Sequence, residues 1–378
     1  MTVSDTGTRP LGTGAIRWLE SLSPWPEEFG LERIRSLLGE LGNPQLAYPA
    51  IHVVGTNGKS TTVRIAEEIL AGQGLAVGAY TSPHVLRWSE RIRVRGEEAD
   101  LERALRRVRA PSERIGATQF EVLTAAALAE FAEAGVDAAV VEAGLGGRLD
   151  ATNVLRSPVQ VLTNVALEHT DVLGGTREQI AAEKLAVVQP GATVVLAEPE
   201  WKETARASGA VDVIVTGRSN VALAVAAAEA FVGRPVDAAP ARDVRLPGRL
   251  EQRSEHPLEL WDGAHNLAGV GYLLPRVPSA RYVLVVSILE DKDVDGMLAA
   301  LSALGEELVA TASSNPRALA AEELGERARA YFPRVHAVSD PAEARERALA
   351  LAGADGAVLV TGSLYLLADL IVRLQPVT

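Results

Sequence analysis

The strongest constraint on the fold is a glycine-rich run that stands between an apolar segment and an amphipathic one. Residues 50–54 are apolar, and Gly55-Thr56-Asn57-Gly58-Lys59-Ser60 follows them directly. In residues 61–70 the apolar side chains return at helical spacing, as Val63, Ala66, Ile69 and Leu70. We therefore predict a strand, a glycine loop and a helix in succession, which is the local structure of α/β folds.

The loop resembles a phosphate loop, although two residues separate its glycines where the standard motif has four. Glycines let backbone N–H groups face phosphate oxygens, a lysine adds positive charge, and a hydroxyl can reach Mg²⁺. The alternative is an ordinary turn that carries a surface lysine. The flanking strand and helix favour the phosphate loop. Its candidate nucleotide contacts are Thr56, Asn57, Gly58, Lys59, Ser60 and Thr61.

Apolar, valine-rich runs alternate with helical segments along the rest of the chain. Further strands are predicted at residues 75–80, 138–142, 159–165, 193–197, 211–216, 258–261, 282–287, 308–312 and 357–361. Helices are predicted at residues 120–133, 178–188, 220–232, 297–304, 319–331, 342–351 and 364–374. Continuous apolar strands separated by helices indicate a mostly parallel sheet that helices cover on both faces.

Three prolines, Pro235, Pro240 and Pro247, interrupt this alternation in a stretch of little periodicity. The chain has 378 residues, more than one hydrophobic core usually serves. We predict an α/β protein with an N-terminal P-loop-type ATPase domain, whose sheet is mostly parallel, at residues 1–243. A smaller, Rossmann-like α/β domain is predicted at residues 244–378.

Composition narrows the partners and the location. A net charge of −12 argues against nucleic acid as the main partner, because phosphate backbones are bound by clustered lysine and arginine. The absence of cysteine excludes disulfides and thiolate metal sites. Residues 1–10 lack the pattern of a signal peptide, and the apolar stretch 221–232 is too short for a membrane span and contains Glu229. We expect a cytoplasmic monomer whose partners are small molecules, with no nucleic acid or membrane.

Several oxygen and nitrogen ligands follow predicted strands. Glu142 ends an apolar strand, where a buried carboxylate is costly unless it faces a cation or a cleft. Ser82 and His169 also come after strands, and Lys184 lies in the helix that follows. Each of these residues alone is commonly a cap, a turn or a structural side chain. Together, at strand ends beside a phosphate loop, Glu142 and Ser82 favour a Mg²⁺ site.

The chain contains many short motifs that occur together in one family. They are Gly30-Leu31-Glu32-Arg33-Ile34, Thr81-Ser82-Pro83-His84, Glu90-Arg91-Ile92, Gly144 to Asn153, His169-Thr170-Asp171, Glu183-Lys184, Pro247-Gly248-Arg249, Asp262-Gly263-Ala264-His265-Asn266 and Thr361-Gly362-Ser363. With the phosphate loop, they make the chain resemble the folylpolyglutamate synthase and dihydrofolate synthase family, a branch of the ATP-dependent ligases that includes the muramyl peptide ligases. The run Leu149-Asp150-Ala151-Thr152-Asn153 is specific to the folate branch.

The resemblance implies roles for individual residues. One Mg²⁺ would be bound by Ser82 and Glu142, and a second by His169 and a carbamylated Lys184, with K⁺ a further candidate cation. ATP would also contact Asn220, Arg249 and Asp262. The implied pterin-pocket residues are Glu28, Phe29, Gly30, Phe120, Glu121, Leu149, Asp150 and Ala151. Lys59, Lys184, His169, Asp150 and His265 are the implied catalytic residues, and His265 and Ser363 are candidates for binding the incoming glutamate.

The implied reaction activates a carboxylate as an acyl phosphate, which the glutamate amine then attacks to form an amide and release phosphate. Two features depart from the family: Ser60 stands where most folate enzymes have a second glycine, and the stretch 205–243 is short. Two alternatives stay open, an amide ligase for a non-folate acid such as a cell-wall precursor, and a nucleotide-binding protein with an inactive site. The sequence does not separate dihydrofolate synthase, folylpolyglutamate synthase and bifunctional activity.

Overall fold

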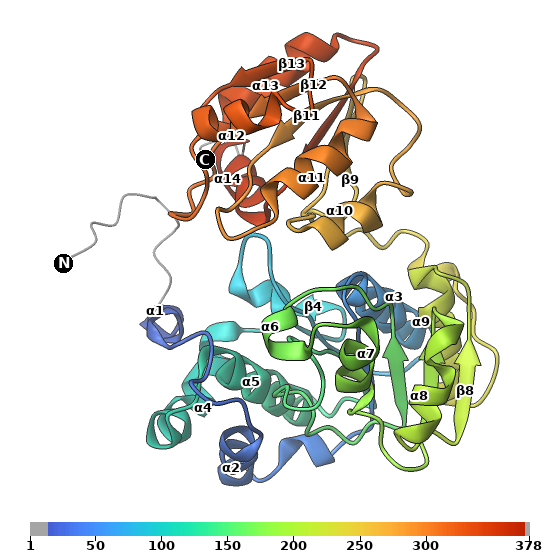
Figure 1. Cartoon of the computed structure of the whole chain (residues 1–378). Coiled ribbons are helices and arrows are strands. Elements are labelled where there is room, and N and C mark those ends of the chain that lie inside the picture. Colours follow the sequence, from blue (N-terminus) through green and yellow to red (C-terminus); the bar gives the residue numbers. More distant parts are fainter. Residues whose placement is uncertain (1–13, 375–378) are drawn as a thin grey trace. The chain divides into compact units, whose positions relative to one another are not determined.

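The computed structural model describes residues 14–374. These residues form two compact units, and the boundary between the units falls between Val244 and Arg245. Each unit is an α/β structure built around its own sheet (Figure 1). The predicted α/β fold class, with two sheets that are mostly parallel, is confirmed. No helix within the described residues is long and apolar enough to cross a membrane.

The first unit contains an eight-stranded sheet in the order β4-β3-β2-β5-β1-β6-β7-β8. Neighbouring strands from β2 to β8 pair in parallel, whereas β3 and β4 pair antiparallel at one edge. The strands are β1 (Ala50–Val54), β2 (Val77–Tyr80), β3 (Ile92–Val94), β4 (Glu97–Glu98), β5 (Ala138–Glu142), β6 (Val159–Leu162), β7 (Thr193–Leu196) and β8 (Asp212–Val215).

The central strand β1 shows how helices cover both faces of this sheet. Ile51 and Val53 lie in a core with residues of α3 and α9, which pack against each other on one face (Figure 1). Ala50 and Val54 point to the opposite face, Ala50 toward α4 and α5 and Val54 toward α7. This alternation is the two-residue period of a strand buried on both faces.

The sheet of the first unit is accompanied by helices, most of which lie between its strands in the sequence. They are α1 (Gly14–Ser21), α2 (Glu32–Glu40), α3 (Lys59–Gly72), α4 (Leu101–Ile115), α5 (Gln119–Glu133), α6 (Thr170–Leu173), α7 (Arg177–Leu185), α8 (Lys202–Ala207) and α9 (Asn220–Val232). The proline-containing segment after α9 still belongs to this unit, because Val236, Ala238 and Val244 pack against the core of α3 and α9.

The second unit contains a six-stranded sheet in the order β13-β12-β11-β14-β10-β9, parallel except for the edge strand β9. Its strands are β9 (Glu251–Glu255), β10 (Leu258–Trp261), β11 (Tyr282–Val286), β12 (Glu307–Ala310), β13 (Arg334–Ala337) and β14 (Ala357–Thr361). Its helices are α10 (Leu267–Leu273), α11 (Val294–Leu301), α12 (Ala321–Ala328), α13 (Pro341–Ala352) and α14 (Leu364–Leu374). Residues of α10, α11 and α12 share one core with inward-facing residues of the sheet.

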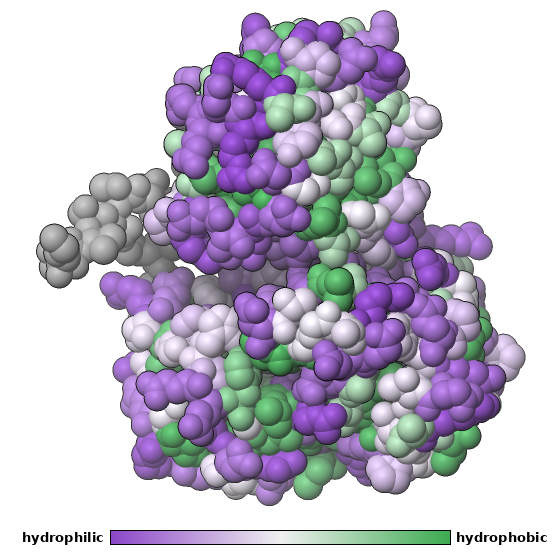
Figure 2. Space-filling view, viewed as in Figure 1, coloured by the Kyte–Doolittle hydropathy of each residue, from purple (hydrophilic) through white to green (hydrophobic). Residues whose placement is uncertain are grey.

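Four strands, β3, β4, β9 and β13, are absent from the sequence prediction. β3 and β4 have only three and two residues, and β4 and β9 are built entirely from polar residues, so neither of the latter two contains an apolar run. Helices α1, α2, α4, α6, α8 and α10 are also absent from the sequence prediction. On the face drawn in Figure 2, hydrophilic residues are spread over both units, with hydrophobic patches among these residues.

Candidate functional site

The phosphate loop joins β1 to α3, as predicted. Gly58 precedes α3 with a φ of 82°, a left-handed conformation that glycine adopts readily. A side chain at Gly55, where φ is 145°, would collide with the Thr163 hydroxyl. Lys59 Nζ donates to the carbonyl oxygens of Gly55 and Thr56 at 3.1 Å each. The loop therefore requires its two glycines and encloses its lysine.

Ser60 fits this arrangement although it departs from the glycine that the resemblance implies at this position. It is the second residue of α3 and is not among the residues with positive φ, so no glycine is required. Its backbone N–H lies in the first turn of a 14-residue helix, where N–H groups have no partner within the helix and favour anions. The departure at position 60 is therefore compatible with phosphate binding.

Glu142 and Ser82 meet at the carboxyl ends of neighbouring strands. Glu142 ends β5, which lies between β1 and β2, and Ser82 follows β2. Only 2% of Glu142 is exposed, and its Oε2 accepts a hydrogen bond of 3.0 Å from the Ser82 backbone N–H. Arg91 donates to the Ser82 hydroxyl at 3.4 Å. A carboxylate and a hydroxyl thus lie together at the carboxyl ends of β5 and β2, and these are ligand types that suit Mg²⁺.

Lys184 extends from α7 to the phosphate loop. The side chain is buried, and Nζ donates to the Gly55 carbonyl oxygen at 2.9 Å. Burial, and secondly the positive charge of Lys59, lower the pKa of Lys184 to about 7. An amine with such a pKa is about half deprotonated near pH 7, and its neutral form can attack CO₂, which an ammonium cannot. The predicted carbamate has a chemically suitable residue here.

His169 lies differently from the strand-end position suggested by its sequence. It precedes the short helix α6 with a φ of 51°, seven residues beyond the end of β6. About half of its side chain is exposed, and Nε2 lies 3.8 Å from Glu168 Oε1. Within residues 14–374, no three histidine or acidic side chains lie together as a ready metal site. A metal bound near His169 would need ligands from a nucleotide or a modified lysine.

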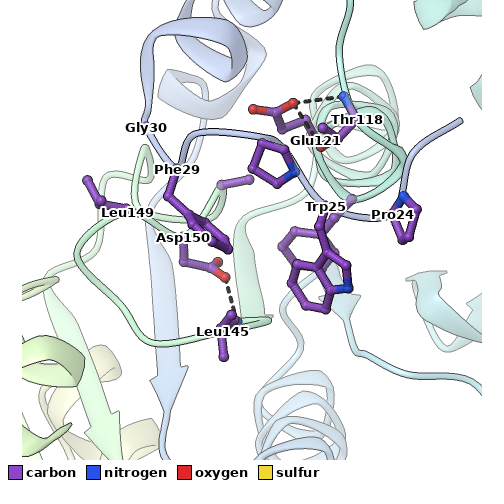
Figure 3. A pocket seen from close by; sticks show the side chains of 12 residues that line it. Pro24, Trp25, Phe29, Gly30, Thr118, Glu121, Leu145, Leu149 and Asp150 are labelled. Carbon is purple, nitrogen blue, oxygen red and sulfur yellow. Dashed lines mark hydrogen bonds between the residues drawn. The ribbon is translucent and has the colours of Figure 1, made fainter. Parts of the chain in front are cut away.

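A pocket of about 390 Å³, part of it open to solvent, lies beside the loop that follows β5 (Figure 3). Its lining includes seven of the predicted pterin-pocket residues, Phe29, Gly30, Phe120, Glu121, Leu149, Asp150 and Ala151. Glu28 is not part of the lining, and its carbonyl oxygen accepts from Arg33. The remaining lining residues are Pro24, Trp25, Pro26, Thr118 and Leu145.

The residues Pro24, Trp25 and Pro26 are absent from the sequence prediction. Trp25 is half exposed, and its ring lies 6.4 Å from that of Phe29 and tilted by 54° (Figure 3). The signal available in the sequence is a tryptophan between two prolines just before Phe29, which is unusual for a plain surface turn. Glu121, which was predicted to bind substrate, accepts from the Thr118 N–H and hydroxyl at 2.8 Å each and pairs with Arg33.

Asp150 is held in the pocket wall by a buried hydrogen-bonded chain. Its Oδ2 accepts from the Leu145 N–H at 2.7 Å, as Figure 3 shows, and its Oδ1 accepts from the Thr152 hydroxyl at 2.5 Å. The Thr152 hydroxyl in turn contacts His52 Nε2 at 2.8 Å, from the middle of β1. Burial raises the pKa of Asp150, whereas these hydrogen bonds oppose the rise. The carboxylate is therefore fixed in position rather than free in solvent.

In the second unit, the candidate residues Asp262, His265 and Ser363 follow the neighbouring parallel strands β10 and β14, whereas Arg249 precedes β9. Asp262 accepts from the N–H groups of Leu250 and Ala264 at 2.9 Å each. Burial raises the pKa of Asp262, and the Arg249 charge opposes this. The two loops are joined because the Gly362 N–H donates to the Ala264 carbonyl oxygen at 3.0 Å. Adjacent loops thus carry His265, whose Nδ1 is 2.9 Å from the Gly263 carbonyl oxygen, and the buried Ser363.

Asn220, the other predicted nucleotide contact, begins α9 in the first unit, directly after the capping residue Ser219. It follows β8, so it lies at the carboxyl edge of the same sheet as the phosphate loop, beyond β6 and β7 in the strand order.

Comparisons with known proteins show which family the chain belongs to. Residues 53–234 match the Mur ligase middle domain, and residues 248–364 match the Mur ligase glutamate ligase domain. A protein of Escherichia coli (strain K12), "Dihydrofolate synthase/folylpolyglutamate synthase", is 33% identical over 397 residues, which cover 93% of each chain. This chain belongs to the folylpolyglutamate synthase/dihydrofolate synthase family. Its relatives include a protein with the same name from Mycobacterium tuberculosis, which is 33% identical over an alignment that covers 79% of this chain and 78% of the relative.

Solved structures of this family resemble the whole chain. The structure titled "E.coli FolC in complex with DHPP and ADP" has a TM-score of 0.86 and 32% identity, and the match covers 95% of this chain and 97% of that one. A Yersinia pestis bifunctional folylpolyglutamate synthase/dihydrofolate synthase, complexed with AMPPNP and Mn, has a TM-score of 0.85, 32% identity and the same coverage. The predicted family and enzyme class, an ATP-dependent carbon–nitrogen ligase, are confirmed.

Proposed function

We propose that this enzyme uses ATP to join L-glutamate to a folate-type acid, either dihydropteroate or a reduced folyl glutamate. The observation that carries the proposal is the loop from Glu142 to Asp150. It begins with a carboxylate beside Ser82, next to the phosphate-loop strand, and ends with a fixed carboxylate in an aromatic pocket. One short segment therefore connects the candidate site of phosphoryl transfer to the candidate site of the acid substrate.

The pocket supports a flat heteroaromatic ring as the substrate group. Phe29 and Phe120 supply apolar surface, and the fixed Asp150 carboxylate can accept N–H groups from the edge of such a ring. Pterins combine a flat ring with donor groups at its edge. Asp150 therefore has a substrate-binding role in this proposal, and its contribution to catalysis is to orient the substrate.

The chemistry starts from a carboxylate, which is a poor electrophile because its oxygen is a poor leaving group. The terminal phosphoryl group of ATP is transferred to a carboxylate oxygen, which gives ADP and an acyl phosphate. The glutamate nitrogen then attacks the carbonyl carbon, loses a proton and displaces inorganic phosphate. Positioning and neutralisation of phosphate charge provide most of the catalysis in such transfers. In this proposal Lys59 balances part of that charge, which its position in the phosphate loop supports, because Nζ donates to the Gly55 carbonyl oxygen there.

Divalent metal suits the oxygen ligands at this edge of the sheet. Ser82 and Glu142 would bind one Mg²⁺, and His169 with a carbamylated Lys184 would bind a second, with K⁺ a further candidate. A bound Mg²⁺ supplies positive charge that stabilises the phosphoryl group during transfer. The buried Lys184 amine supports the carbamate because its lowered pKa increases the neutral fraction of the nitrogen that can react with CO₂. Asn220, Arg249 and Asp262 remain proposed ATP contacts.

The glutamate partner is assigned to the second unit, which matches a glutamate ligase domain. His265 and Ser363 are its proposed contacts, supported by the hydrogen bond that joins their two loops. A Mur-type ligase for a non-folate acid remains the alternative. The aromatic pocket around Asp150 favours a folate-type acid over a cell-wall precursor.

Glutamate-dependent phosphate release tests the proposal. Purified protein is supplied with ATP, Mg²⁺ and bicarbonate, and with dihydropteroate, a reduced folate monoglutamate or no acceptor, and the products are identified by mass. We expect an amide product with at least one acceptor, and the pattern separates synthase, polyglutamate and bifunctional activity. The absence of an amide with either acceptor would refute the proposal. Lys59→Met, which keeps side-chain length without charge, is the matched inactive control.

A further inference from the structure

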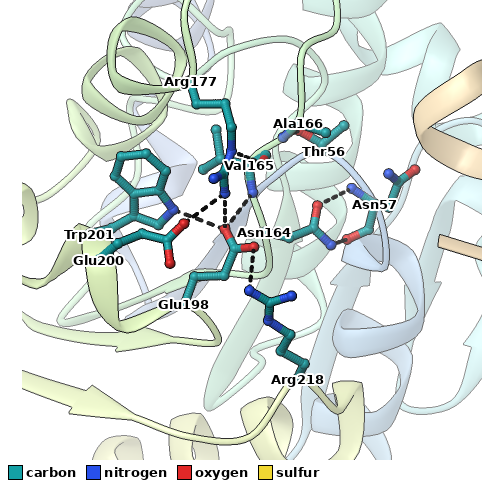
Figure 4. Close-up of polar contacts among 10 residues, drawn as sticks. All are labelled: Thr56, Asn57, Asn164, Val165, Ala166, Arg177, Glu198, Glu200, Trp201 and Arg218. Atoms are coloured by element: carbon teal, nitrogen blue, oxygen red, sulfur yellow. Dashed lines mark hydrogen bonds and ion pairs between the residues drawn. The ribbon is translucent and has the colours of Figure 1, made fainter. Parts of the chain in front are cut away.

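An ion pair brackets the backbone of one residue beside the phosphate loop (Figure 4). Glu198 Oε2 accepts from the Val165 N–H at 3.0 Å, and Arg177 Nε donates to the Val165 carbonyl oxygen at 3.0 Å. The two side chains also pair with each other, at 3.2 Å between Arg177 Nη2 and Glu198 Oε2. Val165 lies beyond the end of β6, where no strand neighbour satisfies its peptide groups, so these charged groups provide that bonding.

Both neighbours of Val165 hold the phosphate loop. Asn164 makes a two-point contact with Asn57, whose N–H donates to Asn164 Oδ1 at 3.0 Å while Asn164 Nδ2 donates to its carbonyl oxygen at 3.1 Å. The Asn164 carbonyl oxygen accepts from the Thr56 N–H at 3.0 Å, and the Ala166 N–H donates to the Thr56 hydroxyl at 3.1 Å. Val165 therefore lies between Asn164 and Ala166, the two residues that bond to Thr56 and Asn57 of the phosphate loop (Figure 4).

Glu198 collects further partners from separate segments. It is 6% exposed, and its Oε2 also accepts from the Trp201 indole N–H at 2.9 Å. Its Oε1 lies 3.6 Å from Arg218 Nη2, two residues before Asn220 at the start of α9. Burial of a carboxylate is costly unless it is paired and hydrogen-bonded, and Glu198 meets both conditions. A buried charge at this place links the loops after β6, β7 and β8 into one arrangement.

We propose that Glu198 and Arg177 are positioning residues for the nucleotide, which clamp Val165 so that Asn164 and Ala166 hold the phosphate loop in its phosphate-binding conformation. Neither side chain has a role in the reaction outlined above. The inference rests on the proposed function only in taking ATP as the nucleotide of this loop. Without the clamp, Thr56 and Asn57 become ordered only when the nucleotide binds. The cost of ordering them is then subtracted from the binding free energy, so the affinity for the nucleotide falls.

Calorimetric titration with Mg²⁺ and ADP tests the clamp in full-length protein. Glu198→Gln removes the charge in the same shape, and Arg177→Lys keeps the charge but cannot reproduce the guanidinium contacts. We expect each variant to bind ADP about tenfold more weakly, which corresponds to about 1.4 kcal/mol. In steady-state assays, KM for ATP rises while KM for glutamate and for the acid substrate stays within about twofold, because the clamp acts through Val165, whose neighbours Asn164 and Ala166 bond to the phosphate loop.

Glu130→Gln is the matched control. Glu130 is also buried, in α5, and pairs with Arg103 and Arg107 at 2.6 Å each, but it has no contact with the phosphate loop. This control is expected to lower thermal stability while ADP binding stays within about twofold of the wild type, since the mutated pair is structural only.

Three results would overturn the clamp. One is wild-type ADP affinity in folded Glu198→Gln and Arg177→Lys, and another is an equal loss in Glu130→Gln, which would mean general destabilisation. If Glu198→Gln does not fold, Arg177→Lys decides by the same criterion. A wild-type protein that binds no nucleotide would overturn the proposed function together with the clamp, whereas normal wild-type binding with unaffected variants overturns the clamp alone.

Discussion

Acid pH should destabilise the first unit through His52, which lies in the central strand β1. The side chain is 1% exposed, and burial lowers its pKa from 6.5 to about 4. The Thr152 hydroxyl donates to the Asp150 carboxylate, so it accepts from His52 Nε2–H, which sets the neutral tautomer. Protonation of the ring would therefore place a charge in the core beside the wall of the pocket.

The direction and the size of this pH effect on stability follow from the two pKa values of His52. Between pH 6.5 and about 4 the unfolded chain binds a proton at His52 that the folded chain does not, so stability falls as the pH falls. The contribution of neutral His52 to the free energy of unfolding is fully present above pH 6.5 and is lost below about pH 4. A shift of about 2.5 pKa units corresponds to about 3 kcal/mol of unfolding free energy.

Urea unfolding of the wild type and His52→Gln at several pH values between 7 and 4 measures this contribution. Tryptophan fluorescence reports mainly on the first unit, because four of the five tryptophans lie there. Glutamine does not titrate but can donate a hydrogen bond to Thr152, as His52 does. All other titrating groups then contribute equally to both proteins, and the difference between the proteins reports on His52. We expect the wild type to lose about 3 kcal/mol more than the variant. Parallel loss in the two proteins, or an NMR pKa of His52 above 6, would refute the reasoning.

Three further predictions concern the pocket and the phosphate loop. A Cβ at Gly144 would lie 2.5 Å from Phe120 Cζ, so Gly144→Ala should push the ring into the pocket and raise KM for the acid substrate about tenfold, with KM for ATP unchanged. Gly175→Ala is its control, since nothing lies within 4 Å there, and an equal effect in both would contradict the reasoning. Lys59→Met should lower ATP-dependent phosphate release by about 100-fold or more while thermal stability is retained, because the lysine charge is lost at the phosphates; release within tenfold of the wild type would count against this role. Lys184→Ala should lose most amide formation and regain part of it with a short-chain carboxylic acid, and full activity without the acid would reject the carbamate.

Local residue patterns were sufficient for the elements that carry the phosphate-binding loop. The apolar run before Gly55 and the helical spacing after Lys59 predict β1 and α3, because strand and helix periodicity depend on near neighbours in the chain. Glu142 and Ser82 were also accessible, since the ends of parallel strands meet at one edge of the sheet. The polar edge strands β4 and β9 could not be predicted from the sequence, because they have no apolar run and their formation depends on pairing with a neighbouring strand.

The sequence by itself determined the α/β class, the phosphate loop and, through its motifs, the family. Only the tertiary structure decided which distant groups meet. It places Lys184 Nζ on the Gly55 carbonyl oxygen, Trp25 beside the pocket of Asp150, and Glu198 on the backbone of Val165. Those contacts join segments more than 30 residues apart, up to 129 residues between Gly55 and Lys184. No local pattern encodes them, because the side chains approach one another only after the helices have packed on the sheet.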